Sequence, residues 1–386
     1  MRPEEVAFGP QQRIEVSGIL ELLSDGQGWL RDIEQNFVPE ETDPYLPANL
    51  VRGENLRPGV LIEGWAEIMK GRKVVVEIST VDGLAPAEAT ALPLFKQMVS
   101  IDPEEQFQLE GGEPEEGDNG ICVNTRILDL ITPIGRGQRG LITAPPRSGK
   151  TILLEHIAKR IVEYYSDVHL MVLLVDERPE EATHFRRSVK GEVIASTNDE
   201  PADRHTRVTE ITVERAKRLV EKGQDVVIVM DSLTRLGRAY NVVTKNSGRT
   251  LSGGVDSRTL EKPKAFFGAA RNVEGGGSLT ILATALIETG SRMDEVIFEE
   301  FKGTGNMELV LSRELAERRI WPAIDINRSG TRKEELLLHP EVYQKVVMLR
   351  RVMSQMHPVE AMQSVISKLQ DTGTNADFLA SFGTKR

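Results

Sequence analysis

A phosphate-binding loop is predicted by the run Ala144-Pro-Pro-Arg-Ser-Gly-Lys-Thr151. An apolar run over 140–143 precedes it, and apolar residues at helical spacing follow it from Ile152. In a strand, tight loop and helix of this kind, backbone N–H groups and the helix N-terminus surround phosphate oxygens. Lys150 then reaches the β- and γ-phosphates, and the hydroxyl of Thr151 ligates Mg²⁺. The run therefore predicts that the chain binds a nucleoside triphosphate with Mg²⁺.

Two apolar runs further along the chain end in carboxylates. The run over 169–176 leads into Glu177, and the run over 225–231 ends at Asp231. The carboxyl ends of parallel strands beside a phosphate loop lie where ligands bind in open α/β sheets. We expect Asp231 on the Mg²⁺ side and Glu177 as the residue that polarises the attacking water. Either acid, taken alone, equally suits a cap of the following helix.

The patterning of the chain predicts two folded parts. Residues 14–80 alternate short apolar and polar runs with breaks at turn residues, which is typical of a small β-barrel. From about residue 125, near-continuous apolar runs alternate with helical periodicity, which indicates a parallel sheet of α/β type. The expected organisation is a short N-terminal segment (1–13), a barrel domain (14–101), an acidic, solvated linker (102–124) and an α/β domain with C-terminal helices (125–386).

Composition limits the class of protein. Of 386 residues, 39% are hydrophobic, but no apolar run has transmembrane length, so we expect a soluble protein without a membrane partner. The single cysteine, Cys122, excludes an internal disulfide, and the N-terminus lacks the order of a signal peptide, which favours a cytoplasmic location. The net charge of −11 is uneven, because residues 1–120 carry −15 and the rest +4. Overall acidity therefore does not exclude a nucleic-acid partner.

Longer motifs follow one another along the α/β part of the chain. They are Asp176-Glu-Arg-Pro-Glu-Glu181, Asp231-Ser-Leu-Thr-Arg-Leu-Gly-Arg-Ala-Tyr-Asn241, Phe266-Phe-Gly-Ala-Ala-Arg-Asn272, Phe301-Lys-Gly-Thr-Gly-Asn-Met-Glu308 and Asp325-Ile-Asn-Arg-Ser-Gly-Thr-Arg-Lys-Glu-Glu335. In order and spacing, the chain from residue 14 to about residue 380 resembles the bacterial transcription termination factor Rho family. The resemblance implies a RecA-like P-loop ATPase domain with an N-terminal OB-fold, cold-shock-like barrel. It also implies a homohexameric ring that hydrolyses ATP, moves along single-stranded RNA as a translocase or helicase, and terminates transcription together with RNA polymerase and elongation factors.

The same resemblance assigns residues to the ATP site. Glu177 is the implied general base, Asp231 the metal-side acid, and Trp321 the residue that stacks on adenine. Arg319 and Arg332 are implied to come from the neighbouring subunit, where a guanidinium stabilises charge that develops during phosphoryl transfer. Without the resemblance, each arginine equally suits a surface ion pair. The implied ATP-binding residues are Gly135, Arg136, Gly137, Gln138, Arg139, Gly140, Arg147, Ser148, Gly149, Lys150, Thr151, Ile152, Arg178 and Trp321.

Two RNA-contact regions are implied as well. Two loops are expected to line a central pore and to contact RNA phosphates and sugars without reading sequence, although the first of them alone also suits a plain connection. These loops contribute Lys245, Arg249, Thr250, Leu251, Ser252, Gly253, Gly254 and Arg292. In the barrel, the aromatic side chains are expected to stack on bases and Arg31 to meet phosphate, although aromatic core residues are the alternative. The barrel residues are Gly26, Gly28, Trp29, Arg31, Asp43 and Tyr45.

Two departures from the family weaken the expected barrel site. Gln27 stands where an aromatic residue is usual, and the segment 70–76 lacks the expected tyrosine. Two other classes of protein remain as alternatives. One is a different RecA-like ring, such as a DNA helicase or a rotary ATP synthase subunit. The other is a non-hydrolysing RNA-binding or regulatory ring, against which the retained Glu177, Asp231, Arg319 and Arg332 argue.

Overall fold

The computed structural model of the chain describes residues 13–111, 121–244, 252–256 and 258–381. These residues form two compact units. One unit holds the chain up to Gln97 together with Glu210–Lys222, and the other holds Met98–Thr209 with the residues from Gly223 onward. Among the described residues, no helix combines the length and the apolar character needed to cross a membrane.

The N-terminal unit contains a closed β-barrel, as the sequence predicts. Alternate strand positions face inward, so Leu20, Leu30, Leu46 and Ile62 are fully buried in its core. Around the barrel the strands follow the order β1 (Ile14–Leu22), β2 (Gly28–Arg31), β3 (Tyr45–Leu46), β5 (Arg72–Val81) and β4 (Leu61–Met69). The same part of the chain forms the short helices α1 (Ala48–Gly53), α2 (Pro86–Ala91) and η1 (Phe95–Gln97).

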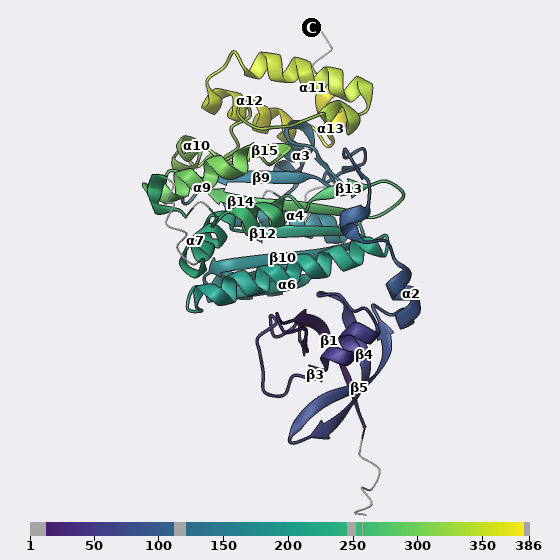
Figure 1. The fold of residues 1–386 in the computed structure, drawn as a ribbon. Helices are drawn as coiled ribbons and strands as arrows, with labels where there is room; N and C mark the ends of the chain where they lie inside the picture. Colours follow the sequence, from purple (N-terminus) through teal and green to yellow (C-terminus); the bar gives the residue numbers. More distant parts are fainter. Residues whose placement is uncertain (1–12, 112–120, 245–251, 257, 382–386) are drawn as a thin grey trace, which may run out of the picture. The chain divides into compact units, whose positions relative to one another are not determined.

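The second unit is built on a large, mainly parallel sheet, which confirms the predicted α/β class. Its central strands are buried on both faces, which explains their near-continuous apolar runs. Figure 1 shows four of these strands side by side, β10, β12, β14 and β9. In order, the sheet contains β11 (Glu192–Thr197), β10 (Val168–Glu177), β12 (Asp225–Asp231), β14 (Ser278–Leu286), β9 (Arg139–Ala144), β15 (Met307–Val310) and β16 (Gly330–Thr331). In addition, β13 (Arg271–Val273) pairs with β14, and β6 (Ser100–Ile101) pairs with β13.

Helices connect these strands. Those that precede β15 in the chain are α3 (Ile121–Ile131), α4 (Lys150–Tyr164), α5 (Pro179–Ser188), α6 (Ala202–Glu221), α7 (Leu233–Val243), η2 (Ser252–Gly254), α8 (Glu261–Phe267) and α9 (Arg292–Lys302). The part of α6 from Glu210 onward belongs to the first unit. The later ones are α10 (Arg313–Glu317), η3 (Glu334–Leu336), α11 (Pro340–Met353), α12 (Pro358–Gln370) and α13 (Asn375–Ser381). The last three lie together near the C-terminus, as the yellow group in Figure 1.

The expected solvated linker over 102–124 is wrong for the part of that range that the structure describes. The side chains of Phe107 and Leu109 are fully buried in the main core of the second unit. Strand β7 (Gln106–Phe107) also pairs with β8 (Ile134–Gly135). The two apolar residues anchor this segment to the core although its overall composition is acidic. Residues 112–120 of the expected linker lie outside the described residues.

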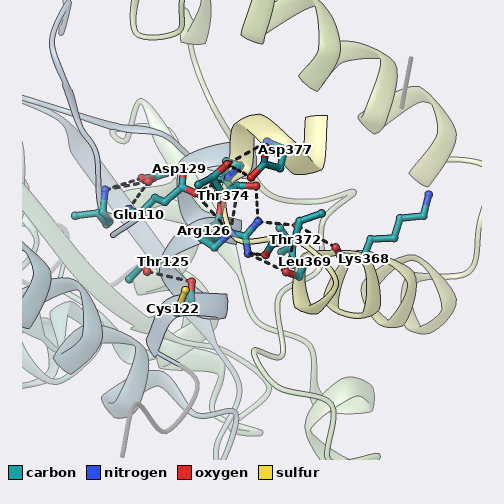
Figure 2. Close-up of polar contacts among 12 residues, drawn as sticks. Glu110, Cys122, Thr125, Arg126, Asp129, Lys368, Leu369, Thr372, Thr374 and Asp377 are labelled. Carbon is teal, nitrogen blue, oxygen red and sulfur yellow. Dashed lines mark hydrogen bonds and ion pairs between the residues drawn. The ribbon is translucent and has the colours of Figure 1, made fainter. Parts of the chain in front are cut away.

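A buried arginine ties the C-terminal helices to α3 (Figure 2). The guanidinium of Arg126 donates to the carbonyl oxygens of Leu369 (2.8 Å), Thr372 (2.6 Å) and Thr374 (2.7 Å), and also to the side chain of Asn375 (3.2 Å). One turn further along α3, the carboxyl of Asp129 accepts the backbone N–H groups of residues 109 and 110. Burial raises the pKa of Asp129 to about 8 despite these hydrogen bonds.

We expect Arg126→Ala to loosen the C-terminal helices. The substitution leaves three carbonyl groups without their buried donor, which costs on the order of 2–4 kcal/mol of unfolding free energy. Amide hydrogen exchange of α12 and α13 should speed up, while exchange in the central sheet stays slow. Arg351→Ala, which removes an exposed arginine of α11, is the control. Unchanged protection of α12 and α13 in Arg126→Ala would contradict the assigned role.

Candidate nucleotide site and RNA-contact segments

The phosphate loop has the predicted context, since it follows β9 and leads into α4. Gly149 immediately precedes the helix with φ of 81°, a conformation that favours glycine. A Cβ at Gly149 would also lie 2.8 Å from the indole of Trp321. The hydroxyl of Ser148 donates to the carbonyl oxygen of Pro145 (2.7 Å) and closes the loop. The structure thus brings Trp321, which is 42% exposed, against the loop, as expected for a residue beside the nucleotide base.

Lys150 lies between the two predicted acids. Its Nζ is 3.2 Å from Oε1 of Glu177 and forms a second, shorter ion pair with Asp231. Both carboxylates are buried, and Asp231 also accepts a hydrogen bond from the hydroxyl of Thr284 (2.7 Å). Three residues that are 27 to 81 positions apart in sequence therefore meet at one point, as predicted.

A strand irregularity aims Glu177 at this point. The register between β10 and β11 shifts between Val175 and Glu177, and Asp176 between them has φ of 56°. Such a bulge re-aims the side chain that follows it. Glu177 therefore turns inward to Lys150 at the end of the strand, while the backbone oxygen of Asp176 is left to accept a hydrogen bond from Arg235.

Burial and neighbouring charges act in opposite directions on the pKa of each residue, Lys150 and Glu177. Burial lowers the pKa of Lys150, but Asp231 and Glu177 outweigh it and raise the pKa above its usual value. Burial raises the pKa of Glu177, and Lys150 offsets only part of that rise. Lys150 therefore stays charged, and Glu177 becomes a stronger proton acceptor than an exposed glutamate.

The hydroxyl of Thr151 is also at the loop, where it donates to Glu181 (3.2 Å). Thr151 and Asp231 offer the hydroxyl and carboxylate oxygens that Mg²⁺ prefers in sites it shares with substrate phosphates. Exposed side chains at Arg147, Ile152 and Arg178 belong to the loop and to the end of β10. Their contact with a nucleotide stays a prediction.

The structure does not bring the segment Gly135–Gly140 to the phosphate loop of the same chain, and its contact with ATP stays a prediction. Arg136 pairs with Asp167 (3.3 Å) and with Asp225, which begins β12, whereas the predicted acid Asp231 ends that strand. The six residues of β9 separate the segment from the loop by on the order of 16 Å, at about 3.3 Å per residue. Residues close in sequence are therefore at opposite edges of the sheet.

The two arginines predicted to act from a neighbouring subunit are also separated. Arg319 is exposed and stands two residues before Trp321, near the phosphate loop. Arg332 donates its backbone N–H to the carbonyl oxygen of Asn306 (2.9 Å), just before β15, and is exposed at the edge where β9 begins. Within one chain, only Arg319 lies on the side of its own phosphate loop.

Helix α7 carries arginines that the sequence analysis missed. Arg235 reaches Glu177, with its Nη2 3.1 Å from Oε1, and Arg238 makes a two-pronged ion pair with Asp294 at the start of α9. Asp294 also accepts from Thr289 (2.6 Å). The signal was available, because Arg235 follows Asp231 by four residues at the start of an expected helix. One helix thus contacts both Glu177 and the first turn of α9.

The described parts of the two predicted pore loops lie side by side. A Cβ at Gly253 would be 2.7 Å from the carbonyl oxygen of Arg292, and Gly253 has φ of 76°. Arg292 is exposed at the first turn of α9, which Ser291 caps. Gly254 also has a positive φ, and Ser252 begins η2. The other predicted contacts of this region, Lys245, Arg249, Thr250 and Leu251, lie outside the described residues.

The barrel places its two aromatic residues together on neighbouring strands. Trp29 pairs with Tyr45 in register, and their half-buried rings meet edge to face with centroids 5.4 Å apart. They are therefore available for stacking and are not core residues. Arg31 departs from the prediction of a phosphate contact, because it is 6% exposed and engaged by Glu21 (2.7 Å) and Asp43. Two carboxylates already neutralise this guanidinium.

Two glycines at the turn between β1 and β2 are required by the backbone conformation and by packing. Gly26 has φ of 81°, and a Cβ at Gly28 would lie 2.6 Å from a methyl group of Leu20 in the barrel core. Only glycine satisfies the first position without strain, and the second leaves no room for a side chain.

Comparison with known proteins supports the same division of the chain. Residues 124–331 match the ATP synthase alpha/beta family, nucleotide-binding domain, and residues 16–87 match the Rho termination factor, RNA-binding domain. Among solved structures, the assembled ATPase EscN of the enteropathogenic E. coli type III secretion system has a TM-score of 0.58 at 21% identity, over 75% of this chain and 69% of that chain. The fold and site therefore define a RecA-like P-loop ATPase joined to an OB-type RNA-binding barrel.

Curated relatives narrow this class to one family. Transcription termination factor Rho of Cereibacter sphaeroides is 50% identical over 95% of this chain and 87% of its own length. The proteins of the same name from Aquifex aeolicus and Haemophilus influenzae are 51% and 52% identical, each over 94% of this chain and over 84% and 86% of their own lengths. The chain belongs to the transcription termination factor Rho family.

Proposed function

We propose that this chain forms a homohexameric ring that hydrolyses ATP between neighbouring subunits, moves along single-stranded RNA and terminates transcription. The observation that carries the proposal is that Arg332 and the phosphate loop lie at opposite edges of the same sheet. Because β9 lies between them, Arg332 cannot reach a γ-phosphate bound to its own chain. A subunit packed against that edge supplies the phosphate instead, which is how an arginine finger acts in trans.

Hydrolysis follows from the charges around Lys150. In our proposal, the β- and γ-phosphates of bound ATP replace Glu177 and Asp231 as the partners of the Lys150 ammonium group. Thr151 and Asp231 would hold Mg²⁺, which would supply positive charge to the transferring phosphate. Glu177, released from Lys150 and held by Arg235, then accepts a proton from the attacking water.

RNA binding and hydrolysis are joined through α7. Arg292 and the glycines of η2 offer a cation and backbone amides to RNA phosphates, which needs no base recognition. Thr289, in the loop before α9, donates a hydrogen bond to Asp294, and Asp294 forms an ion pair with Arg238 of α7. Arg235, also in α7, forms an ion pair with Glu177. We therefore place the ring on RNA in the cytoplasm, with RNA polymerase and elongation factors as its partners in termination.

Glu177→Gln should retain nucleotide and lose turnover. The amide cannot accept the proton of the attacking water, so the rate of ATP hydrolysis should fall by on the order of 10²–10⁴-fold. Binding of a fluorescent ATP analogue measures the first property, and phosphate release measures the second. Glu180→Gln, an exposed residue of α5, is the matched control. Loss of nucleotide binding with the fold intact would show that Glu177 has a different role.

Mixed rings test the action of Arg332 across an interface. Arg332→Ala and Lys150→Ala subunits are each inactive alone, but together they form some interfaces with an intact loop on one side and an intact arginine on the other. We expect partial recovery of RNA-stimulated phosphate release on mixing. Mass measurement of differently tagged subunits confirms that mixed rings form. Mixed rings without recovery, at any ratio of the two variants, would contradict hydrolysis between subunits.

A further inference from the structure

A buried polar cluster occupies the turn between β11 and α6, beside the end of β10. Its members are Ser196, Glu200 and His205, of which Ser196 is 0% and His205 is 5% exposed. The hydroxyl oxygen of Ser196 lies 2.7 Å from Nδ1 of His205 and 2.7 Å from Oε2 of Glu200. Polar groups are costly to bury unless they are hydrogen-bonded. These mutual hydrogen bonds therefore hold the three side chains in one arrangement.

The chemistry of the three groups sets the direction of the hydrogen bonds. A serine hydroxyl has one proton to donate, and a carboxylate can only accept. The hydroxyl of Ser196 therefore donates to Glu200, and Nδ1 of His205 carries the proton that it donates to Ser196. Burial lowers the pKa of His205, although the carboxylates of Asp176 and Glu200 oppose the shift. At neutral pH, His205 is thus an uncharged donor with a single tautomer.

Glu200 closes the turn whose backbone contacts Glu177. Its Oε2 accepts the backbone N–H of Thr197 (3.0 Å), and its own backbone N–H donates to the carbonyl oxygen of Thr197 (2.9 Å). The next residue, Asn198, donates its backbone N–H to the carbonyl oxygen of Glu177 (2.9 Å). The position of this turn therefore determines where the backbone of Glu177 lies.

Glu177 stands beyond the regular part of the strand ladder. On one side, β12 pairs with β10 only as far as Leu174. On the other side, the register of β11 shifts after Val175, and Glu177 pairs with Thr197 at the start of the turn. A general base must lie within hydrogen-bond reach of the attacking water, and a displacement of about 1 Å can cost on the order of 100-fold in rate. The turn is therefore the neighbouring backbone on which this precision depends.

We propose that His205 is a positioning residue for Glu177, which it holds in place through Ser196 and the turn over 197–200. This inference rests on the proposed role of Glu177 as the general base. His205 acts on the orientation of the base and not on the binding of ATP or RNA. A purely structural contribution to the start of α6 is the alternative, and it predicts different kinetics.

Two substitutions of the histidine separate these roles. His205→Leu removes the Nδ1 donor, whereas His205→Asn keeps an amide donor near the same position. At saturating RNA, we expect His205→Leu to lower the maximal rate of phosphate release by about 10–100-fold. The KM for ATP should stay unchanged, because only an interaction of the transition state is lost. His205→Asn should keep most of the rate. An equal loss in both variants, or a raised KM at an unchanged maximal rate, would overturn the inference.

Matched controls exclude effects of folding and assembly. His169 is 2.9 Å from Glu192 where β10 and β11 begin, at the opposite end of the same two strands, so His169→Leu should keep the wild-type rate. Sedimentation with RNA gives the amount of assembled ring, and all rates are expressed per ring. If His205→Leu does not assemble, Ser196→Ala breaks the same hydrogen-bond chain with the loss of one hydroxyl and should show the same loss of rate. A wild-type rate per ring in these variants would contradict the role of His205.

The background of Glu177→Gln tests positioning directly. His205→Leu should cause little further loss there, because no base is left to position. A further loss by the same factor as in the wild-type chain would assign His205 a structural role and overturn the inference. The two proposals fail separately: normal turnover in Glu177→Gln removes the general base, whereas an inactive Glu177→Gln beside a fully active His205→Leu removes only the role of His205.

Discussion

Lys150→Ala abolishes ATP hydrolysis in our account, which is the largest effect we expect from any single substitution. The ammonium group faces the point where phosphate charge develops, and a preorganised charge of this kind contributes on the order of 10²–10³-fold or more to the rate. Nucleotide affinity should fall as well, because the same group meets the β- and γ-phosphates in the ground state. RNA-stimulated phosphate release, measured at saturating RNA, checks the prediction.

A control for Lys150→Ala must distinguish a loss of catalysis from a loss of folding stability. Lys150 neutralises two buried carboxylates, and removing one partner of a buried ion pair costs about 3–5 kcal/mol of stability. Lys150→Gln, which keeps a hydrogen-bond donor of similar size, should be less destabilised and equally inactive. Lys159→Ala removes a partly exposed lysine of the same helix, whose partner Glu155 keeps its contact with His184, and should behave as wild type. Near-normal turnover in either Lys150 variant would remove the phosphate-loop assignment.

Arg292→Ala should remove most RNA-stimulated hydrolysis, the second-largest effect. Arg292 is exposed beside Gly253, and its loop is tied through Asp294 and Arg238 to the helix that holds Glu177. Loss of one phosphate contact should also flatten the salt dependence of RNA binding by about one contact. The maximal rate should therefore fall even when RNA is saturating.

The barrel variants provide the contrast. Trp29→Ala and Tyr45→Ala each remove a stacking ring, worth about 1–3 kcal/mol per base, so more RNA should be needed for half-maximal activity. Their maximal rate should stay unchanged, because neither ring belongs to the unit that holds Glu177. ATPase activity measured against RNA concentration at two salt levels tests all three variants. A lowered maximal rate in the barrel variants, with Arg292→Ala unaffected, would reverse the assigned division of labour.

Local patterns predicted that Lys150, Glu177 and Asp231 meet because each lies in an element with its own sequence signal. The phosphate loop is one continuous run, and Glu177 and Asp231 each follow an apolar strand, so parallel strands had to bring them to one edge. The spacing of Arg235, four residues after Asp231, was visible in the sequence, but it did not identify Glu177 as the partner of this arginine. Its contact with Glu177 depends on the bulge at Asp176, which sequence does not reveal.

Three features lie where local sequence patterns do not place them. Gly135–Arg139 and the phosphate loop are neighbours in sequence, but β9 runs between them and carries them to opposite edges. The linker prediction failed at Phe107 and Leu109 because two apolar residues in an acidic stretch are too few to form a period. Arg31 was predicted as a phosphate contact from the family resemblance, whereas its two carboxylate partners come from β1 and from the segment before β3.

Phosphate release with and without RNA tests the central claim most directly. The purified chain is incubated with ATP and Mg²⁺ alone, with a cytidine-rich single-stranded RNA, and with DNA of the same sequence; Lys150→Ala serves as the background. We expect a low rate without nucleic acid, a large increase with RNA that Lys150→Ala abolishes, and a much smaller response to DNA. Equal rates in the presence and absence of RNA, or activation by DNA alone, would contradict an RNA-dependent motor.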